Sequence, residues 1–449
     1  MKTKMRASGI VAIAAAAALV FAACGNGDAG ADPTPEPPAT VEPDPDPDPP
    51  VGADPVTITW WHNGTGEPLL SFWQSVADSF MADNPHVTIN VEAIQNEDLR
   101  NTVLPNAFAA GTAPDIFQSW GGGELMRYYQ AGQLMDVSAF IPAPVAGAAE
   151  AFRIGDGIWG VPYTSLPSGF WLNMDLWEEA GLTEADFPTT LDDLFAAWDA
   201  LKEAGITPVA VGGGAGWPAA HWWYWTALRS VSPAAMQAGI VDHDFSDQGW
   251  LDASDLLQTI IDRDAFNTGW QATVPQEGPG SASGQVVLGQ AAMQLMGTWD
   301  FGVMGGIYNE AHGLDDDAQD HAAFIRWFPF PQVPGAGGDP RAIMGGVDGF
   351  SVRNDAPVEA AQFLAYIVST DVQTRYAAMG NIPVDPGATH AMPSGPLDDA
   401  AAAVANASSV QLWLDTALGD GAFNSAIVAF MSGQGSAQDV VDAISAMFN

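Results

Sequence analysis

Cysteine and lysine are almost absent from this chain of 449 residues. The only cysteine is Cys24, and Lys202 is the only lysine after Lys4. Because there is no second cysteine, no disulfide can form within the chain, and the fold must be stabilised by buried apolar surface. The formal net charge of −41 repels polyanions, which argues against nucleic acid and anionic lipid as partners. We attribute this charge to solubility or to adaptation to salt, in preference to a partner that recognises the acidic surface.

Metal and cofactor motifs are also missing. No two histidines stand at the spacing of metal ligands, and the glycine runs at 121–123 and 212–214 lack the lysine and the flanking pattern of phosphate-binding loops. We therefore expect no cofactor and no metal. The remaining composition, with 47% hydrophobic and 15% charged residues, is that of a globular protein, and the length suits two lobes.

The N-terminus has the pattern of a secretory leader. A basic start is followed by an apolar stretch that ends at Phe21, and two alanines precede Cys24. This pattern resembles the lipobox of bacterial lipoproteins, although Phe21 stands where Leu, Val or Ile is usual. We predict a signal peptide at 1–23 with lipidation of Cys24, and an extended Pro/Asp-rich tether at 24–55. The body is then held at the extracellular face of the cell membrane; the alternative is an ordinary leader with a chance cysteine.

Strands and helices alternate through the first part of the body. Period-two and helical patterns predict strands at 56–61, 87–92 and 115–120, and helices at 69–82 and 96–110, the second broken near Pro105. This order favours a parallel sheet with right-handed crossovers. Later segments predict further strands at 207–212, 292–296 and 347–352, and helices at 191–204, 357–369, 371–379 and 398–405.

Tryptophan is unusually frequent, with 17 Trp against 7 Tyr. Many of these residues adjoin Gly, Pro or Asn and not a regular helical pattern. An indole ring offers a flat apolar face and a single N–H donor, and pyranose rings present C–H patches that match such a face. A neutral saccharide therefore fits this composition, although any single tryptophan can equally be a core residue.

Several motifs resemble one known family. They are Ala113–Gly123 (APDIFQSWGGG), Ile58–Trp61, Gly160–Tyr163, Phe170–Leu176, Ala292–Trp299 and Gly380–Val384. Together they resemble the family 1 extracellular solute-binding proteins of ABC sugar importers over residues 56–449. The start Trp60-Trp61-His62 and the Gln118–Gly123 run are most similar to actinobacterial members that bind xylobiose-like disaccharides.

The resemblance implies an α/β fold of the two-lobe periplasmic-binding-protein type (type II, or Venus-flytrap), with the ligand between the lobes. By analogy, lobe 1 comprises 56–163 and 347–376, and lobe 2 comprises 164–346 and 377–449. The family implies a monomer, not an enzyme, that captures a neutral mono- or oligosaccharide and delivers it to the permease of an ABC transporter.

Candidate ligand-binding residues come from both lines of reasoning. Loops that follow parallel strands line the crevice of an open α/β sheet, and the family commonly places stacking aromatics at the positions of Trp120 and Trp299. For His62 a satisfied loop histidine is the simpler interpretation, and the run around Trp222 is more typical of a buried helix start. The full set of candidates is His62, Asn63, Glu97, Trp120, Trp217, Trp222, Trp299 and Asp348.

Three other functions stay open. The solute can be of another kind, such as a polyol, glycerol phosphate or a peptide. A secreted glycoside hydrolase needs two carboxylates about 5–10 Å apart, and 54 acidic residues offer many pairs, but no repeated pattern of glutamates at strand ends is present. A surface adhesin would show no closure on a ligand.

Overall fold

The computed structural model describes residues 54–316, 318–418 and 421–448. The predicted signal peptide, Cys24 and nearly all of the predicted tether lie outside these ranges. Among the helices that are described, none is long and apolar enough to span a bilayer.

Most described strands belong to one eight-stranded sheet. Its main path runs β2-β1-β3-β9-β6-β7, with β10 paired to β9 and β8 paired to β6. The strands are β1 (Val56–His62), β2 (Val87–Ala93), β3 (Ile116–Ser119), β6 (Val161–Asn173), β7 (Met293–Gly297), β8 (Ile325–Phe328), β9 (Ile343–Val352) and β10 (Val410–Leu412). As predicted, β1 is parallel to β2 and β3. A separate hairpin is formed by β4 (Arg153–Ile154) and β5 (Gly157–Ile158).

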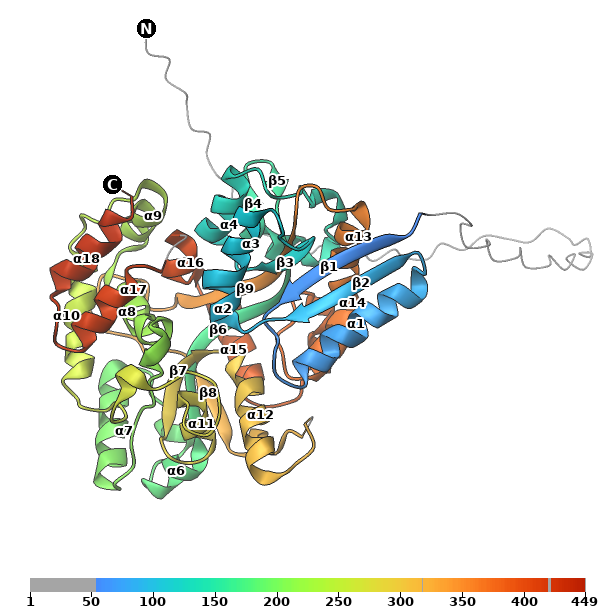
Figure 1. Cartoon of the computed structure of the whole chain (residues 1–449). Coiled ribbons are helices and arrows are strands. Elements are labelled where there is room, and N and C mark those ends of the chain that lie inside the picture. Colours follow the sequence, from blue (N-terminus) through green and yellow to red (C-terminus); the bar gives the residue numbers. More distant parts are fainter. Residues whose placement is uncertain (1–53, 317, 419–420, 449) are drawn as a thin grey trace, which may run out of the picture. The chain divides into compact units, whose positions relative to one another are not determined.

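Two long antiparallel strands connect the halves of this sheet. The first half of β6 pairs with β9, whereas its second half, from Ser168 to Asn173, pairs with β7 and β8. The end of β9, from Gly349 to Val352, pairs with β3. The strands β6 and β9 therefore run from the β1–β3 side to the β7–β8 side (Figure 1). The crossing strand predicted at 347–352 is present and begins four residues earlier.

The buried apolar side chains form three clusters that follow the predicted division into lobes. One cluster, which includes Ile58 and Phe350, takes all its buried members except Val384 from the lobe 1 segments. The other two, around Trp198 and around Trp327, take all of theirs from lobe 2. Separate cores joined by shared strands support the proposed lobes, whose bounds remain a prediction.

The helices pack on this sheet through apolar stripes. In α1 the buried residues Phe72, Trp73, Val76, Ala77 and Phe80 recur at helical spacing, and α1 lies beside β2 with α13 and α14 nearby (Figure 1). The helices are α1 (Leu69–Asp83), α2 (Asn96–Asp98), α3 (Leu104–Ala110), α4 (Gly122–Gln130), α5 (Ala146–Ala149), α6 (Met174–Glu179), α7 (Leu191–Glu203), α8 (Trp217–Ser230), α9 (Pro233–Asp242), α10 (Gly249–Ile261), α11 (Ala282–Val287), α12 (Asp300–His312), α13 (Val358–Ile367), α14 (Thr370–Ala378), α15 (Pro396–Asn406), α16 (Leu414–Leu418), α17 (Asn424–Met431) and α18 (Ala437–Ala446).

One predicted helix is interrupted near the expected place, and one predicted strand does not form. The helix predicted at 96–110 is interrupted by a π-helical turn at Leu99–Val103, before Pro105. Pro105 is the second residue of α3, which continues directly from this turn, and its ring has no N–H to donate to the helix. The prediction of a strand at 207–212 was wrong, because only isolated bridges form at Val209. The neighbouring residue, Pro208, has no N–H to donate to a strand ladder.

Candidate functional site

Residues that follow the first three strands lie at the same end of the sheet. The side-chain amide of Asn63, after β1, donates to Oδ1 of Asn96, after β2, at 3.0 Å. The guanidinium of Arg100 lies 5.3 Å from the centre of the Trp120 ring, which follows β3. The carboxyl ends of parallel strands meet at one edge, so lobe 1 presents these side chains together.

Lobe 2 contributes a group of four rings, which we call the aromatic cluster: Trp217, His221, Trp299 and Trp413. Trp217 and His221 are one helical turn apart on α8, with ring centres 5.0 Å apart. The His221 ring stacks on Trp413 at 4.0 Å and 10°. Trp299 lies 6.0 Å from Trp217 and 5.8 Å from Trp413. Trp217 and Trp299 are only partly buried, so the cluster retains accessible indole surface.

Polar side chains join the predicted lobes around this cluster. Nε1 of Trp217 donates to Oε1 of Glu97 at 3.0 Å. Nε2 of Gln95 donates to Oε1 of Glu277 at 3.1 Å. Hence the loop and helix after β2 touch lobe 2 at two points, and the aromatic cluster lies at the contact between lobes.

Arg100 also links the two predicted lobes. Its Nε is 2.9 Å from Glu124 of lobe 1, and its Nη1 is 3.5 Å from Asp415 of lobe 2. Burial alone would lower the pKa of Arg100, but the two carboxylates outweigh it and hold the pKa above its usual value. The positive charge is thus already matched by two negative ones and offers little to an anionic solute.

Asp348 stands on β9, one of the two connecting strands. Nε2 of Gln118 donates to its Oδ2 at 3.2 Å. The residue keeps some exposed surface, but burial of its carboxyl raises the pKa to about 7, with Arg100 opposing and Glu124 adding to the rise. Asn63, after β1, has the opposite effect and lowers this pKa, so Asp348 lies close to residues at the ends of both β1 and β3.

The structure does not bring His62 or Trp222 to the contact between the lobes. His62 is fully buried against Trp60 and Trp73, and its Nδ1 accepts from the backbone N–H of Gly64 at 3.1 Å. Burial lowers its pKa to about 4. Trp222 is 1% exposed and packs against Phe170 and other rings of the lobe 2 core. Both are core residues, and we leave them out of the candidate site. The burial of Trp222 agrees with the simpler interpretation, whereas His62 ends strand β1 and is not a loop histidine.

Four residues of this region were missing from the predicted set: Arg100, His221, Trp413 and Asp415. Arg100 is a single basic residue within a helical segment, and Trp413 follows a strand of three residues that is too short to recognise. The spacing of His221 four residues after Trp217 was available in the sequence, but the apolar run around it is typical of a buried helix.

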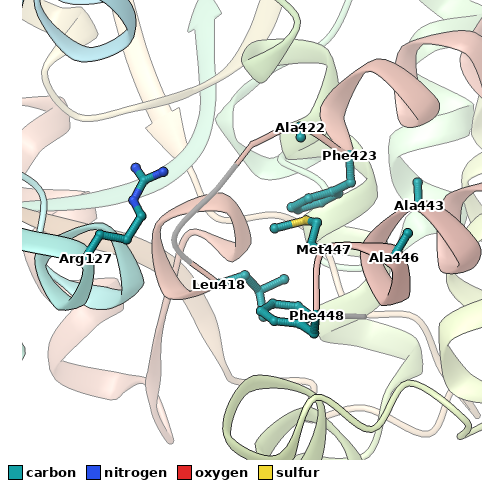
Figure 2. A pocket seen from close by; sticks show the side chains of 8 residues that line it. All are labelled: Arg127, Leu418, Ala422, Phe423, Ala443, Ala446, Met447 and Phe448. Atoms are coloured by element: carbon teal, nitrogen blue, oxygen red, sulfur yellow. The ribbon is translucent and has the colours of Figure 1, made fainter. Parts of the chain in front are cut away.

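A cavity of about 530 Å³ lies elsewhere, between Arg127 on α4 and the C-terminal helices. Figure 2 shows the Arg127 guanidinium on one side and mainly apolar side chains on the other, among them Phe423 and Met447. None of the candidate site residues lines it. In the part of the chain that the structure describes, no three His, Cys, Asp or Glu side chains gather as a metal site.

The fold and this site define a class of two-lobe α/β binding proteins. Residues 63–374 match the model of the bacterial extracellular solute-binding protein family, and the chain belongs to that family. This confirms the predicted family and the expectation of a binding protein and not a hydrolase.

Individual relatives are more distant. A 253-residue stretch is 26% identical to an uncharacterized ABC transporter extracellular-binding protein of Pyrococcus horikoshii, covering 54% of each chain. A probable sugar-binding periplasmic protein of Mesorhizobium japonicum is 26% identical over 45% of this chain and 48% of its own. An sn-glycerol-3-phosphate-binding periplasmic protein of Shigella flexneri is 30% identical over 36% and 39%. The chain thus matches about half the length of these curated relatives, or less.

A solved structure from work on xylan utilization by Caldanaerobius polysaccharolyticus superposes with a TM-score of 0.77, at 23% identity over 88% of this chain and all of that one. At this identity the likeness confirms the predicted fold class alone.

Proposed function

We propose that this chain captures a neutral mono- or oligosaccharide between its lobes and delivers it to the membrane permease of an ABC transporter. The observation that carries the proposal is the aromatic cluster at the contact between the lobes. Indole faces supply apolar burial against a sugar ring, while Glu97, Asn63 and Asp348 provide acceptors and donors for hydroxyl groups. A sugar that contacts both lobes favours the closed arrangement.

Charge supports a neutral solute over a phosphorylated one. Arg100 is the cation among these residues, and Glu124 and Asp415 already pair with it. An anion placed here would also face Glu97 and Asp348. One relative is named for sn-glycerol 3-phosphate, so this solute is the rival that a test must include.

A thermal-shift screen tests the proposal. The purified chain is heated with xylo-, cello-, malto- or chito-oligosaccharides, and separately with glycerol 3-phosphate and with short peptides. Binding to the native state raises Tm, and we expect a rise of a few degrees with at least one neutral sugar. The narrower proposal of a xylobiose-like ligand expects the largest rise with the xylo-series. A shift with glycerol 3-phosphate or a peptide alone contradicts the sugar proposal.

We further propose that acylated Cys24 anchors the chain at the outer face of the membrane. Expression of Cys24→Ser in a bacterial host should move the protein from the membrane fraction to the soluble fraction. Mass spectrometry of the wild-type N-terminus should find a lipid-modified Cys24. An unmodified mature N-terminus at another residue would point to an ordinary leader.

A further inference from the structure

His221 has no hydrogen bond to either ring nitrogen among the residues that the structure describes. The residue is 3% exposed, and Nδ1 is fully buried. The other two buried imidazoles also have one buried nitrogen without a partner, Nε2 of His62 and Nδ1 of His321. Each of those rings is anchored by the backbone through its other nitrogen, since Nδ1 of His62 accepts from Gly64 and Nε2 of His321 lies 3.1 Å from the carbonyl of Phe301. A buried polar atom without a partner is costly and calls for an explanation.

The position of His221 supplies that explanation. Its ring is held between Trp413, on which it stacks, and Trp217, whose Nε1 binds Glu97 of lobe 1. Arg100 of lobe 1 is close enough for its charge to act on this ring. His221 therefore sits where the aromatic cluster at the contact between the lobes meets the lobe 2 core, to which Trp413 and Tyr224 belong.

The chemistry of the ring matches a hydroxyl group. Burial, and to a smaller extent the charge of Arg100, lowers the pKa of His221 to about 3, so the imidazole is neutral at pH 7. A neutral imidazole has one N–H donor and one acceptor nitrogen, and a sugar hydroxyl can complement either. Because the ring is fixed by stacking, little side-chain entropy is lost when it binds.

We propose that His221 is a specificity-determining residue, which binds one sugar hydroxyl through Nδ1 and so fixes the orientation of the sugar ring against the indoles. The inference rests on the proposed function and adds to it a residue that selects among sugars. A sugar without that hydroxyl leaves the ring nitrogen unpaired, and such mismatches are rejected more strongly than a missing apolar group.

Two substitutions at position 221 separate hydrogen bonding from packing. His221→Phe keeps an aromatic ring on Trp413 but removes both nitrogens. His221→Asn loses the ring but retains a polar atom where Nδ1 stands. The probes are xylobiose, cellobiose, maltose and chitobiose, and Kd is measured by tryptophan fluorescence for whichever binds the wild type most tightly. His312→Phe, at an exposed histidine, is the matched control.

We expect His221→Phe to weaken binding about 10- to 100-fold while its Tm without sugar stays near that of the wild type. His221→Asn should recover most of the affinity, and His312→Phe should bind like the wild type. If His221→Phe does not fold, His221→Gln takes its place, since it is polar but has no polar atom at the Nδ1 position; the same loss is expected.

The two proposals can fail separately. If the wild type binds none of these sugars nor their longer homologues, the proposed function fails. If the wild type binds one of them and His221→Phe, or His221→Gln in its place, binds it within about twofold, the sugar proposal stands and the role of His221 is overturned. Equal losses in the Phe and Asn variants would likewise overturn it, since packing alone would then explain the effect.

Discussion

Trp217 Nε1 donates a hydrogen bond of 3.0 Å to Oε1 of Glu97 and so joins α8 in lobe 2 to α2 in lobe 1. The donor belongs to an indole of the aromatic cluster, and the acceptor follows a strand of the opposite lobe. The contact thus joins the two predicted lobes beside the aromatic cluster. If the lobes separate, as the proposed function requires, this hydrogen bond has to break.

Removal of this acceptor should weaken sugar binding. Glu97→Ala takes a charge-assisted hydrogen bond from the closed arrangement, and we expect Kd to rise about 10-fold. Titration by tryptophan fluorescence measures the effect. The control is Glu92→Ala, at an exposed glutamate on β2, which should bind like the wild type. An unchanged Kd in Glu97→Ala would show that its hydrogen bond to Trp217 does not contribute to sugar binding.

Loss of Arg100 should destabilise the fold. Arg100→Met leaves the buried carboxylates of Glu124 and Asp415 without their cation, a change of the kind that costs most in buried ion pairs. Because the Arg100 side chain keeps 21% exposure, we expect a loss of roughly 1–3 kcal/mol in urea denaturation. The exposed pair of Arg153 and Glu150 provides the control, and Arg153→Met should change stability far less. Similar losses of unfolding free energy in the two variants would show that the ion pairs of Arg100 with Glu124 and Asp415 do not stabilise the fold.

The stability effect of Asp348 should depend on pH. Its pKa is about 7 in the folded chain and near 4 when unfolded, so its contribution is full below pH 4 and is lost as pH rises through 7. Asp348→Asn removes this dependence. Its Tm should therefore rise relative to the wild type between pH 5 and pH 8.

Melting curves of both proteins at pH 5, 6, 7 and 8 check this expectation. Asp78→Asn, at an exposed aspartate, should give a difference from the wild type that does not vary with pH. A constant or shrinking difference between Asp348→Asn and the wild type would contradict the raised pKa.

Trp222 should behave as a core residue and not as a ligand contact. Trp222→Ala opens a cavity in the lobe 2 core and should cost about 3–5 kcal/mol. The folded fraction should still bind sugar with a Kd within about twofold of the wild-type value. Calorimetry at a temperature where the variant is folded tests both statements, and a large loss of affinity would return Trp222 to the candidate site.

Local patterns in the sequence predicted most of the fold. The strands β1, β2 and β3, with α1 between the first two, follow from alternation and helical spacing within short windows. The prediction for 207–212 was wrong although its short apolar run is buried as in a strand, since only isolated bridges form at Val209 and Pro208 has no N–H to donate. Pro105 indicated a break in the helix at 96–110, but no local pattern indicated that the break is a π-helical turn at 99–103.

Contacts between distant segments could not be predicted in the same way. Arg100 meets Asp415 across 315 positions of sequence, and Trp413 reaches the aromatic cluster only because β10 pairs with β9. The strand ends placed Asn63, Glu97 and Trp120 correctly relative to the sheet, since topology alone decides that edge. The aromatic rings that lie near these three residues are decided by contacts between the lobes, and no short stretch of sequence contains both sides of such a contact.

The most direct test of the account is calorimetric titration of the wild type, Trp299→Leu and Trp159→Leu with the sugar that raises Tm most. Trp159 is partly buried in lobe 1 against Tyr129, away from the aromatic cluster. The account predicts that Trp299→Leu weakens binding at least about 10-fold, whereas Trp159→Leu binds like the wild type. Equal affinity in all three proteins would contradict a sugar site built on the aromatic cluster.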